Sequence, residues 1–166
     1  CIPGIKTRTI GNFDRIWSLM FDSSDKPYPR AALEFERLIP KLDFINNELI
    51  AAYQRTFRKT AENLTLNQGI MLMAALEAFR LEKMQYPNEL LELVAAGYIL
   101  KVPNDPFTQN ESFKYTRKGD KYLLYSIGPD MSDEKGRAQL PYFSIEEPNR
   151  GDIVFSPGLN IWHQPQ

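Results

Sequence analysis

The segment from Thr60 to Met84 constrains the fold most, because its pattern predicts a long helix that is apolar on nearly every side. Between Gly69 and Phe79 only Glu77 is charged. Two apolar stripes recur at helical spacing: Leu66, Ile70, Met73 and Leu76 form one, and Leu72, Ala75 and Phe79 form the other. A helix of this kind is buried on more than one side. We therefore expect it to lie between a sheet and the N-terminal helices, with Thr60 as its N-cap.

The first 59 residues also carry helical patterns. Apolar residues recur every three or four positions in residues 12–21 and 29–39, and again in residues 41–58. Pro40 ends the second of these helices, because the residue before a proline avoids the helical conformation. We expect residues 1–59 to be a helical extension or the end of a preceding domain.

The pattern changes after the long helix. Tyr86-Pro87 breaks the helix, and residues 89–96 predict a short helix. Residues 112–117 and 121–127 then alternate as two strands around a tight connection, and residues 152–155 predict a third short strand. The sequence therefore predicts an α+β domain over residues 60–156, in which the long helix packs on a small antiparallel sheet. Residues 157–166 are expected to be an irregular tail.

A long loop lies between the second and third predicted strands. It runs from residue 131 to 150 and is rich in Asp, Glu, Gly, Pro and Asn. A structureless loop of this length is uncommon in a compact domain unless something holds it. Asp130 and Asp152 lie at its two ends, and Asp133 lies near the first. Oxygen ligands in this arrangement indicate a hard cation.

Several short motifs occur in the same order along this sequence as in a known protein family. They are Tyr86-Pro87, Leu90 to Val94, Gly97-Tyr98, Val102 to Phe107, Tyr115, Tyr122 to Asp130 and Gly151-Asp-Ile153. The most specific is the run Tyr-Ser-Ile-Gly-Pro-Asp, which ends at Asp130 and is followed later by Gly-Asp-Ile. In these motifs the chain resembles the C-terminal domain of the type II secretion major pseudopilin and related soluble pilin-like bacterial domains. The resemblance covers about residues 61–156.

The resemblance implies a calcium site in the long loop. It puts the carboxylates of Asp130 and Asp152 at ligand positions, together with the main-chain carbonyl of Ile127. An oxygen just after Asp130 would complete the set, from Ser132 or Asp133. Calcium is therefore the one cofactor that we expect.

Two other roles for the same carboxylates remain open. Asp130 and Asp152 can cap turns, or they can pair with Arg137 or Arg150 in the same stretch. The loop is longer than the usual pseudopilin loop, so a basic side chain can take the place of the metal.

Composition excludes several classes of function. The net charge is −1, so no overall basic field attracts nucleic acid or anionic lipid. The single cysteine, Cys1, excludes an intrachain disulfide and a cysteine metal cluster. The sequence contains no apolar run long enough to span a bilayer. Because it begins with Cys1 rather than Met, we expect it to be a piece of a longer protein.

The sequence offers little for catalysis. Its one histidine, His163, lies in the tail, and no Gly-x-Ser-x-Gly motif is present. We therefore predict that the chain is not an enzyme. The tyrosines at 98, 115, 122 and 125 are expected to fill the core rather than to form a binding face.

The resemblance implies a non-catalytic structural or assembly domain in the bacterial cell envelope, on its periplasmic side or outside. Self-association or protein partners are then expected. A role in a pseudopilus filament needs an apolar helix upstream of Cys1. Two alternatives remain: a soluble module that binds a peptide or partner protein, and an accessory domain of an enzyme whose active site lies outside this chain.

Overall fold

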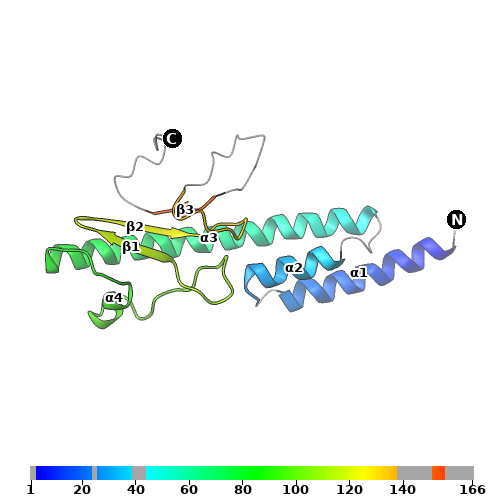
Figure 1. Cartoon of the computed structure of the whole chain (residues 1–166). Helices are drawn as coiled ribbons and strands as arrows, with labels where there is room; N and C mark the ends of the chain where they lie inside the picture. Colours follow the sequence, from blue (N-terminus) through cyan, green and yellow to red (C-terminus); the bar gives the residue numbers. More distant parts are fainter. Residues whose placement is uncertain (1–2, 24–25, 39–43, 138–150, 156–166) are drawn as a thin grey trace. The chain divides into compact units, whose positions relative to one another are not determined.

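The structure is a computed structural model that describes residues 3–23, 26–38, 44–137 and 151–155 (Figure 1). Its helices are α1 (Pro3–Ser23), α2 (Tyr28–Leu38), α3 (Phe44–Lys83) and α4 (Leu91–Ala95). Its strands are β1 (Lys114–Lys118), β2 (Lys121–Ser126) and β3 (Ile153–Val154). The predicted α+β class and the predicted helices before the sheet are confirmed. The chain divides into two compact units, Cys1–Ala61 and Glu62–Gln166.

The first unit contains α1, α2 and the N-terminal part of α3. Its buried apolar residues are Ile16, Ala31, Phe35 and Ile50. Tyr53 packs beside them and donates a hydrogen bond from its hydroxyl to the carbonyl of Met20 (2.9 Å). α1 begins earlier than the predicted residue 12, because Pro3 suits the first turn of a helix.

α3 is one continuous helix, so the prediction of two helices meeting near Thr60 is wrong. No glycine or proline interrupts residues 44–68. Thr60 does not act as an N-cap. Its hydroxyl donates to the carbonyl of Thr56 (3.1 Å), as a threonine inside a helix does. The boundary between the two units, after Ala61, therefore falls inside α3.

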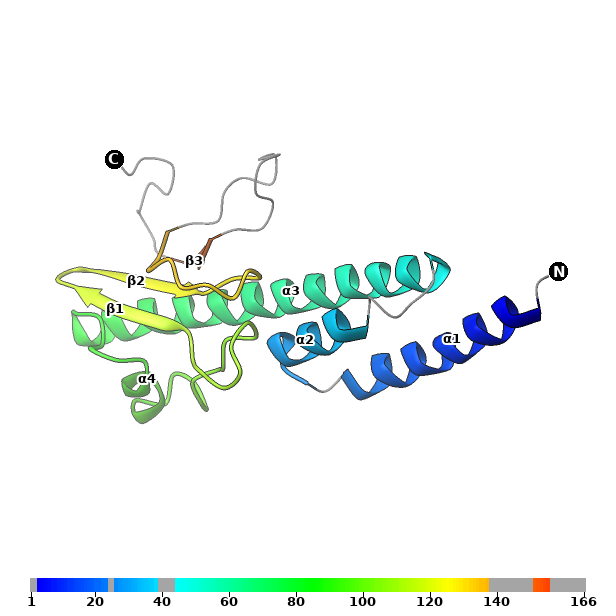
Figure 2. The same cartoon turned by 45° about the vertical axis from the view of Figure 1, so that its right-hand side comes forward.

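The second unit places a three-stranded antiparallel sheet, in the order β1-β2-β3, along the C-terminal part of α3 (Figures 1 and 2). β1 and β2 form the predicted hairpin, with Lys118 paired to Lys121. Gly119, in the two-residue connection, has φ 63°, which glycine adopts without steric cost. No helix in the described part of the chain is both long and apolar enough to cross a bilayer.

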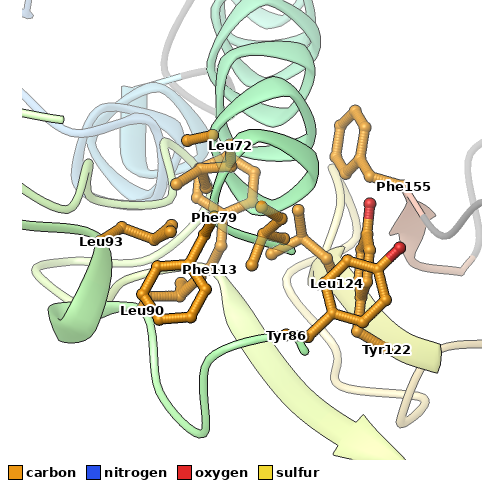
Figure 3. Packing of buried hydrophobic residues seen from close by; sticks show 11 residues of the cluster. Leu72, Phe79, Tyr86, Leu90, Leu93, Phe113, Tyr122, Leu124 and Phe155 are labelled. Carbon is orange, nitrogen blue, oxygen red and sulfur yellow. The ribbon is translucent and has the colours of Figure 1, made fainter. Parts of the chain in front are cut away.

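The core of the second unit joins one face of α3 to the sheet and to α4 (Figure 3). Its buried members are Leu72, Ala75, Leu76, Phe79, Tyr86, Leu90, Leu93, Phe113, Tyr122, Leu124 and Phe155. Tyr86 and Tyr122 meet edge to face, with ring centroids 4.8 Å apart. Tyr98 and Tyr115 pack against this core and Tyr125 is buried, as the sequence predicted.

The opposite face of α3 is exposed. Ile70 is 60% exposed, and Leu66 and Leu81 are also exposed. Within the second unit the helix is therefore buried on one side, and the predicted contact of its other side with the N-terminal helices stays a prediction. A single small sheet covers only one side of a helix, and this side carries Leu72, Leu76 and Phe79.

Gly69 lies where α3 meets the ring of Phe155. A Cβ atom added at Gly69 would overlap the Phe155 ring, so we expect Gly69→Ala to destabilise the chain by about 1 to 3 kcal/mol. In a Phe155→Ala background the overlap is gone. There the same substitution should stabilise the chain by about 1 kcal/mol, because alanine favours a helix more than glycine does. Urea denaturation of the wild type, the two single variants and the double variant measures the change in the free energy of unfolding in each background. The same sign in both backgrounds would contradict this packing.

Candidate functional site

The two ends of the long loop meet at Gly128 and Gly151. Gly128 has φ 72°, and a Cβ atom there would lie 2.5 Å from the carbonyl oxygen of Gly151. Only glycine fits both the conformation and the space. The chain before the loop therefore lies directly against the chain after it, although residues 138–150 lie outside the described structure.

Asp130 links the two ends of the loop by a hydrogen bond. Its Oδ2 accepts a hydrogen bond from the N–H of Gly151 (2.9 Å), and its Oδ1 accepts one from the N–H of Ser132 (3.2 Å). Both carboxylate oxygens thus have backbone donors. This geometry is the turn-capping role that the sequence left open for Asp130.

Asp152 is the most deeply buried acid of the predicted set, with an exposed fraction of 0%. Its Oδ2 accepts a hydrogen bond from the N–H of Gly136 (2.7 Å), and its own N–H donates to the carbonyl of Arg137 (2.9 Å). Its Oδ1 is buried and has no hydrogen-bond donor among the described residues.

The surroundings of Asp152 disfavour its charge. Burial raises the pKa of Asp152 to about 6, the negative charges of Glu134 and Asp133 act in the same direction, and the backbone N–H groups of Gly136 and Glu134 oppose them. A buried carboxylate oxygen without a donor is costly when ionised. With its pKa at about 6, Asp152 is mostly ionised at neutral pH, and a bound cation would lower the cost of its buried charge.

The remaining predicted ligands lie around the same turn. Asp133 is exposed, and its Oδ1 accepts from the Tyr125 hydroxyl (3.1 Å) and from the N–H of Lys135 (2.9 Å). Burial and the Asp133 carboxylate raise the pKa of Tyr125 to about 12. Ser132 is exposed and Ile127 is half-buried. The N–H of Ile127 donates to Asp105 (3.0 Å).

Sequence reasoning missed two acids near this loop. Asp105 is buried and accepts hydrogen bonds from the N–H of Phe107 (3.0 Å), the hydroxyl of Ser126 (2.8 Å) and the N–H of Ile127. Burial raises the pKa of Asp105, and these three donors oppose that rise. Glu134 carries a second buried carboxylate oxygen, Oε2, that lacks a partner. No spacing in the sequence indicated either role.

The fit of this site to calcium depends on Asp152 and Glu134. Calcium takes six to eight oxygen ligands. Asp152 Oδ1 and Glu134 Oε2 are both available as ligands, whereas both oxygens of Asp130 already accept backbone hydrogen bonds. Among the described residues, no group of three or more Asp, Glu, His or Cys side chains lies close enough together to hold a metal ion. The described geometry thus gives Asp130 a capping role, and calcium ligation by Asp152 stays a prediction.

The ion-pair alternative finds no partner within the described ranges. Ion pairs within these ranges join Lys26 to Glu34, Arg80 to Glu77, Lys83 to Glu82 and Lys114 to Glu111, and none of these four includes Asp130 or Asp152. Arg137 contributes its main-chain carbonyl rather than its side chain. Arg150, Cys1 and His163 lie outside the described residues.

Comparisons with known proteins leave the resemblance to pseudopilins as a prediction. No protein-family model matches the sequence, and no curated protein or solved structure matches it significantly.

Proposed function

We propose that this chain is a non-catalytic, pilin-like structural or assembly domain of the bacterial envelope, acting on the periplasmic side or outside the cell, with a calcium-stabilised loop. The observation that supports the assembly role is the division of α3 into two apolar faces. One face is buried against the sheet, and the other is exposed.

The exposed face has the chemistry of a contact surface. Leu66, Ile70, Met71 and Leu81 are large, apolar and exposed. No charged residue interrupts α3 between Glu62 and Glu77. Leu81 lies beyond Glu77, so the uncharged stretch carries Leu66, Ile70 and Met71. Exposed apolar side chains grouped in this way on a folded protein are typical of an interaction site. A second helix that packs against it would remove these side chains from water.

Calcium would stabilise the loop by neutralising buried negative charge. Asp152 Oδ1 and Glu134 Oε2 would hold the ion, with oxygens of Ile127, Asp130, Ser132 and Asp133 as the further ligands that the resemblance implies. The ion supplies positive charge where Asp152 lacks a donor. Extracellular calcium modules bind with dissociation constants of about 0.1 to 1 mM, which suits a location outside the cytoplasm.

The assembly role is tested with a charged substitution on the exposed face. We expect the chain to self-associate at concentrations of about 10 to 100 μM, and Ile70→Asp to weaken this association at least about tenfold. Sedimentation velocity over a concentration series measures the effect. Leu100→Asp is the matched control, because Leu100 is equally apolar and 99% exposed but lies outside α3. A wild-type chain that remains monomeric at all these concentrations, or equal weakening by both variants, would contradict the proposal.

A further inference from the structure

β1 forms an edge of the sheet, since among the described strands it pairs with β2 alone. Tyr115 in β1 is the register partner of Leu124 in β2. The carbonyl of Leu124 accepts a hydrogen bond from the N–H of Phe155 (2.8 Å), so the backbone groups of Leu124 face away from β1. In an antiparallel pair, the backbone groups of Tyr115 must then face outward, to the open edge. The alternation of a strand gives Arg117 the same orientation.

The open edge has a defined start. Asn104 forms a bridge with Ser112, and the N–H of Asp105 donates to the carbonyl of Glu111 (2.8 Å). The segment around Asn104 therefore occupies the edge just before β1 and leaves Tyr115 and Arg117 beyond it. An added strand would continue the line that Asn104 begins.

A cavity of about 460 Å³ lies beside this edge. Asn88, Asn104, Asn110 and Ser112 supply neutral polar atoms to its lining, and Val102 and Phe113 supply apolar surface. Glu89 adds a carboxylate, so the side chain that enters the cavity is an uncharged one. Amide side chains offer both donors and acceptors, as a peptide backbone requires. The volume is sufficient for one or two side chains of an extended peptide.

The charges along β1 select the kind of strand that fits. Lys114, Arg117 and Lys118 make three of its five residues basic. Lys114 pairs with Glu111 (2.6 Å), whereas the Arg117 guanidinium donates to the neutral oxygens of Asn88 (3.2 Å) and Gln85 (3.4 Å). A second copy of β1 would bring like charges together, which is unfavourable across strands. A strand with acidic side chains would instead be complementary in charge to β1.

We propose that the open edge of β1 binds an extended acidic peptide segment by strand addition. The peptide backbone pairs with the outward N–H and C=O groups of Tyr115 and Arg117, a carboxylate meets the Arg117 guanidinium, and one side chain enters the cavity beside Asn88 and Asn104. This mode obtains affinity from main-chain hydrogen bonds and specificity from the pocket. It goes beyond the proposed assembly role, because it uses neither the exposed face of α3 nor the long loop.

The probe is a fluorescein-labelled peptide, acetyl-Glu-Val-Glu-Val-Glu-amide, titrated with the full chain and followed by fluorescence polarisation. We expect saturable binding below about 1 mM. The matching Lys-Val-Lys-Val-Lys peptide should bind at least about tenfold more weakly, because its charges repel those of β1. An acidic peptide with an N-methyl group on every residue should not bind, because neither of its edges keeps an N–H donor for strand pairing.

Variants at one position separate charge from backbone pairing. Arg117→Gln keeps the outward N–H but loses the charge, and it should weaken binding about tenfold. Arg117→Pro also removes the N–H; an edge strand tolerates proline there, and binding should be abolished. Lys121→Gln in β2 is the control and should bind as the wild type does. No saturable binding of the acidic peptide, equal binding of the basic or N-methylated peptide, or unchanged affinity in Arg117→Gln would overturn the proposal, even if Arg117→Pro does not fold.

Discussion

Replacing Leu76 by alanine is expected to lower the free energy of unfolding by about 2 to 5 kcal/mol, and Phe79→Ala by about 3 to 5 kcal/mol. Both side chains are buried in the core cluster that also contains Leu124 and Phe113, and Figure 3 shows Phe79 within it. Each substitution removes apolar contacts and leaves a cavity that neighbouring side chains fill only in part. Urea denaturation followed by far-ultraviolet circular dichroism measures the change.

The control for these substitutions lies on the same helix. Ile70→Ala removes apolar atoms from the exposed face, so in dilute solution it should change the free energy of unfolding by less than about 0.5 kcal/mol. A contrast between Ile70 and Leu76 is required by one-sided burial of α3. Losses below about 0.5 kcal/mol at both Leu76 and Phe79 would show that this packing is wrong.

The elements with a strong local signal could be predicted from the sequence. The hairpin of β1 and β2 has alternating apolar residues around Gly119, and both its strands and its connection are confirmed. Burial of α3 could not be predicted in the same way. Its apolar residues are distributed around the whole helix, so the pattern does not distinguish a face that meets a sheet from one left for another contact. The structure buries Leu72 and exposes Ile70.

The continuity of α3 was missed for a similar reason. Thr60 is a residue type that caps helices, but threonine also occurs inside them with its hydroxyl bonded four residues back. The sequence carries no signal that separates these two uses. Only the absence of Gly and Pro in residues 44–68 indicated one helix rather than two.

The candidate site was predicted in part. Asp130 and Asp152 were singled out because they flank the loop, and the structure brings the two ends of the loop together through Asp130 and Gly151. Glu134 was missed, because one acid in an acidic loop carries no distinguishing pattern. The contact of Asp105 with Ser126 was also missed, because it joins residues that are 21 positions apart. Contacts of this range depend on the tertiary fold.

In the absence of calcium, Asp152→Asn is expected to stabilise the chain at neutral pH. The pKa of Asp152 is about 6 in the folded chain, above its ordinary value of 3.8. The folded chain therefore binds a proton at Asp152 more tightly than the unfolded chain does. The contribution of Asp152 to the stability of the wild type should therefore be greatest below about pH 4 and fall as the pH rises through about 6, by up to about 3 kcal/mol. Asparagine carries no charge at any of these pH values, and the variant should lack this loss.

Calcium should make the wild type more stable than Asp152→Asn, the reverse of their order without calcium. A bound cation stabilises ionised Asp152, and calcium at a hundred times its dissociation constant adds about 2.7 kcal/mol to the wild type. Asp152→Asn keeps one oxygen but loses the charge, so it should gain little. The measurement is a urea midpoint for each protein at about pH 5 and about pH 7.5, with chelator and with millimolar calcium.

The same four conditions distinguish the other roles of Asp152. If a basic side chain such as Arg137 or Arg150 were its partner, the variant would be destabilised equally with and without calcium, by about 3 to 5 kcal/mol for a buried pair. If Asp152 only capped the turn at Gly136, calcium would leave both midpoints unchanged. A calcium response of equal size in wild type and variant would place the ion on other oxygens of the loop. The variant should be the more stable protein in chelator and the wild type the more stable one in calcium. This reversal is expected only if Asp152, which is buried with one oxygen lacking a donor, is a calcium ligand.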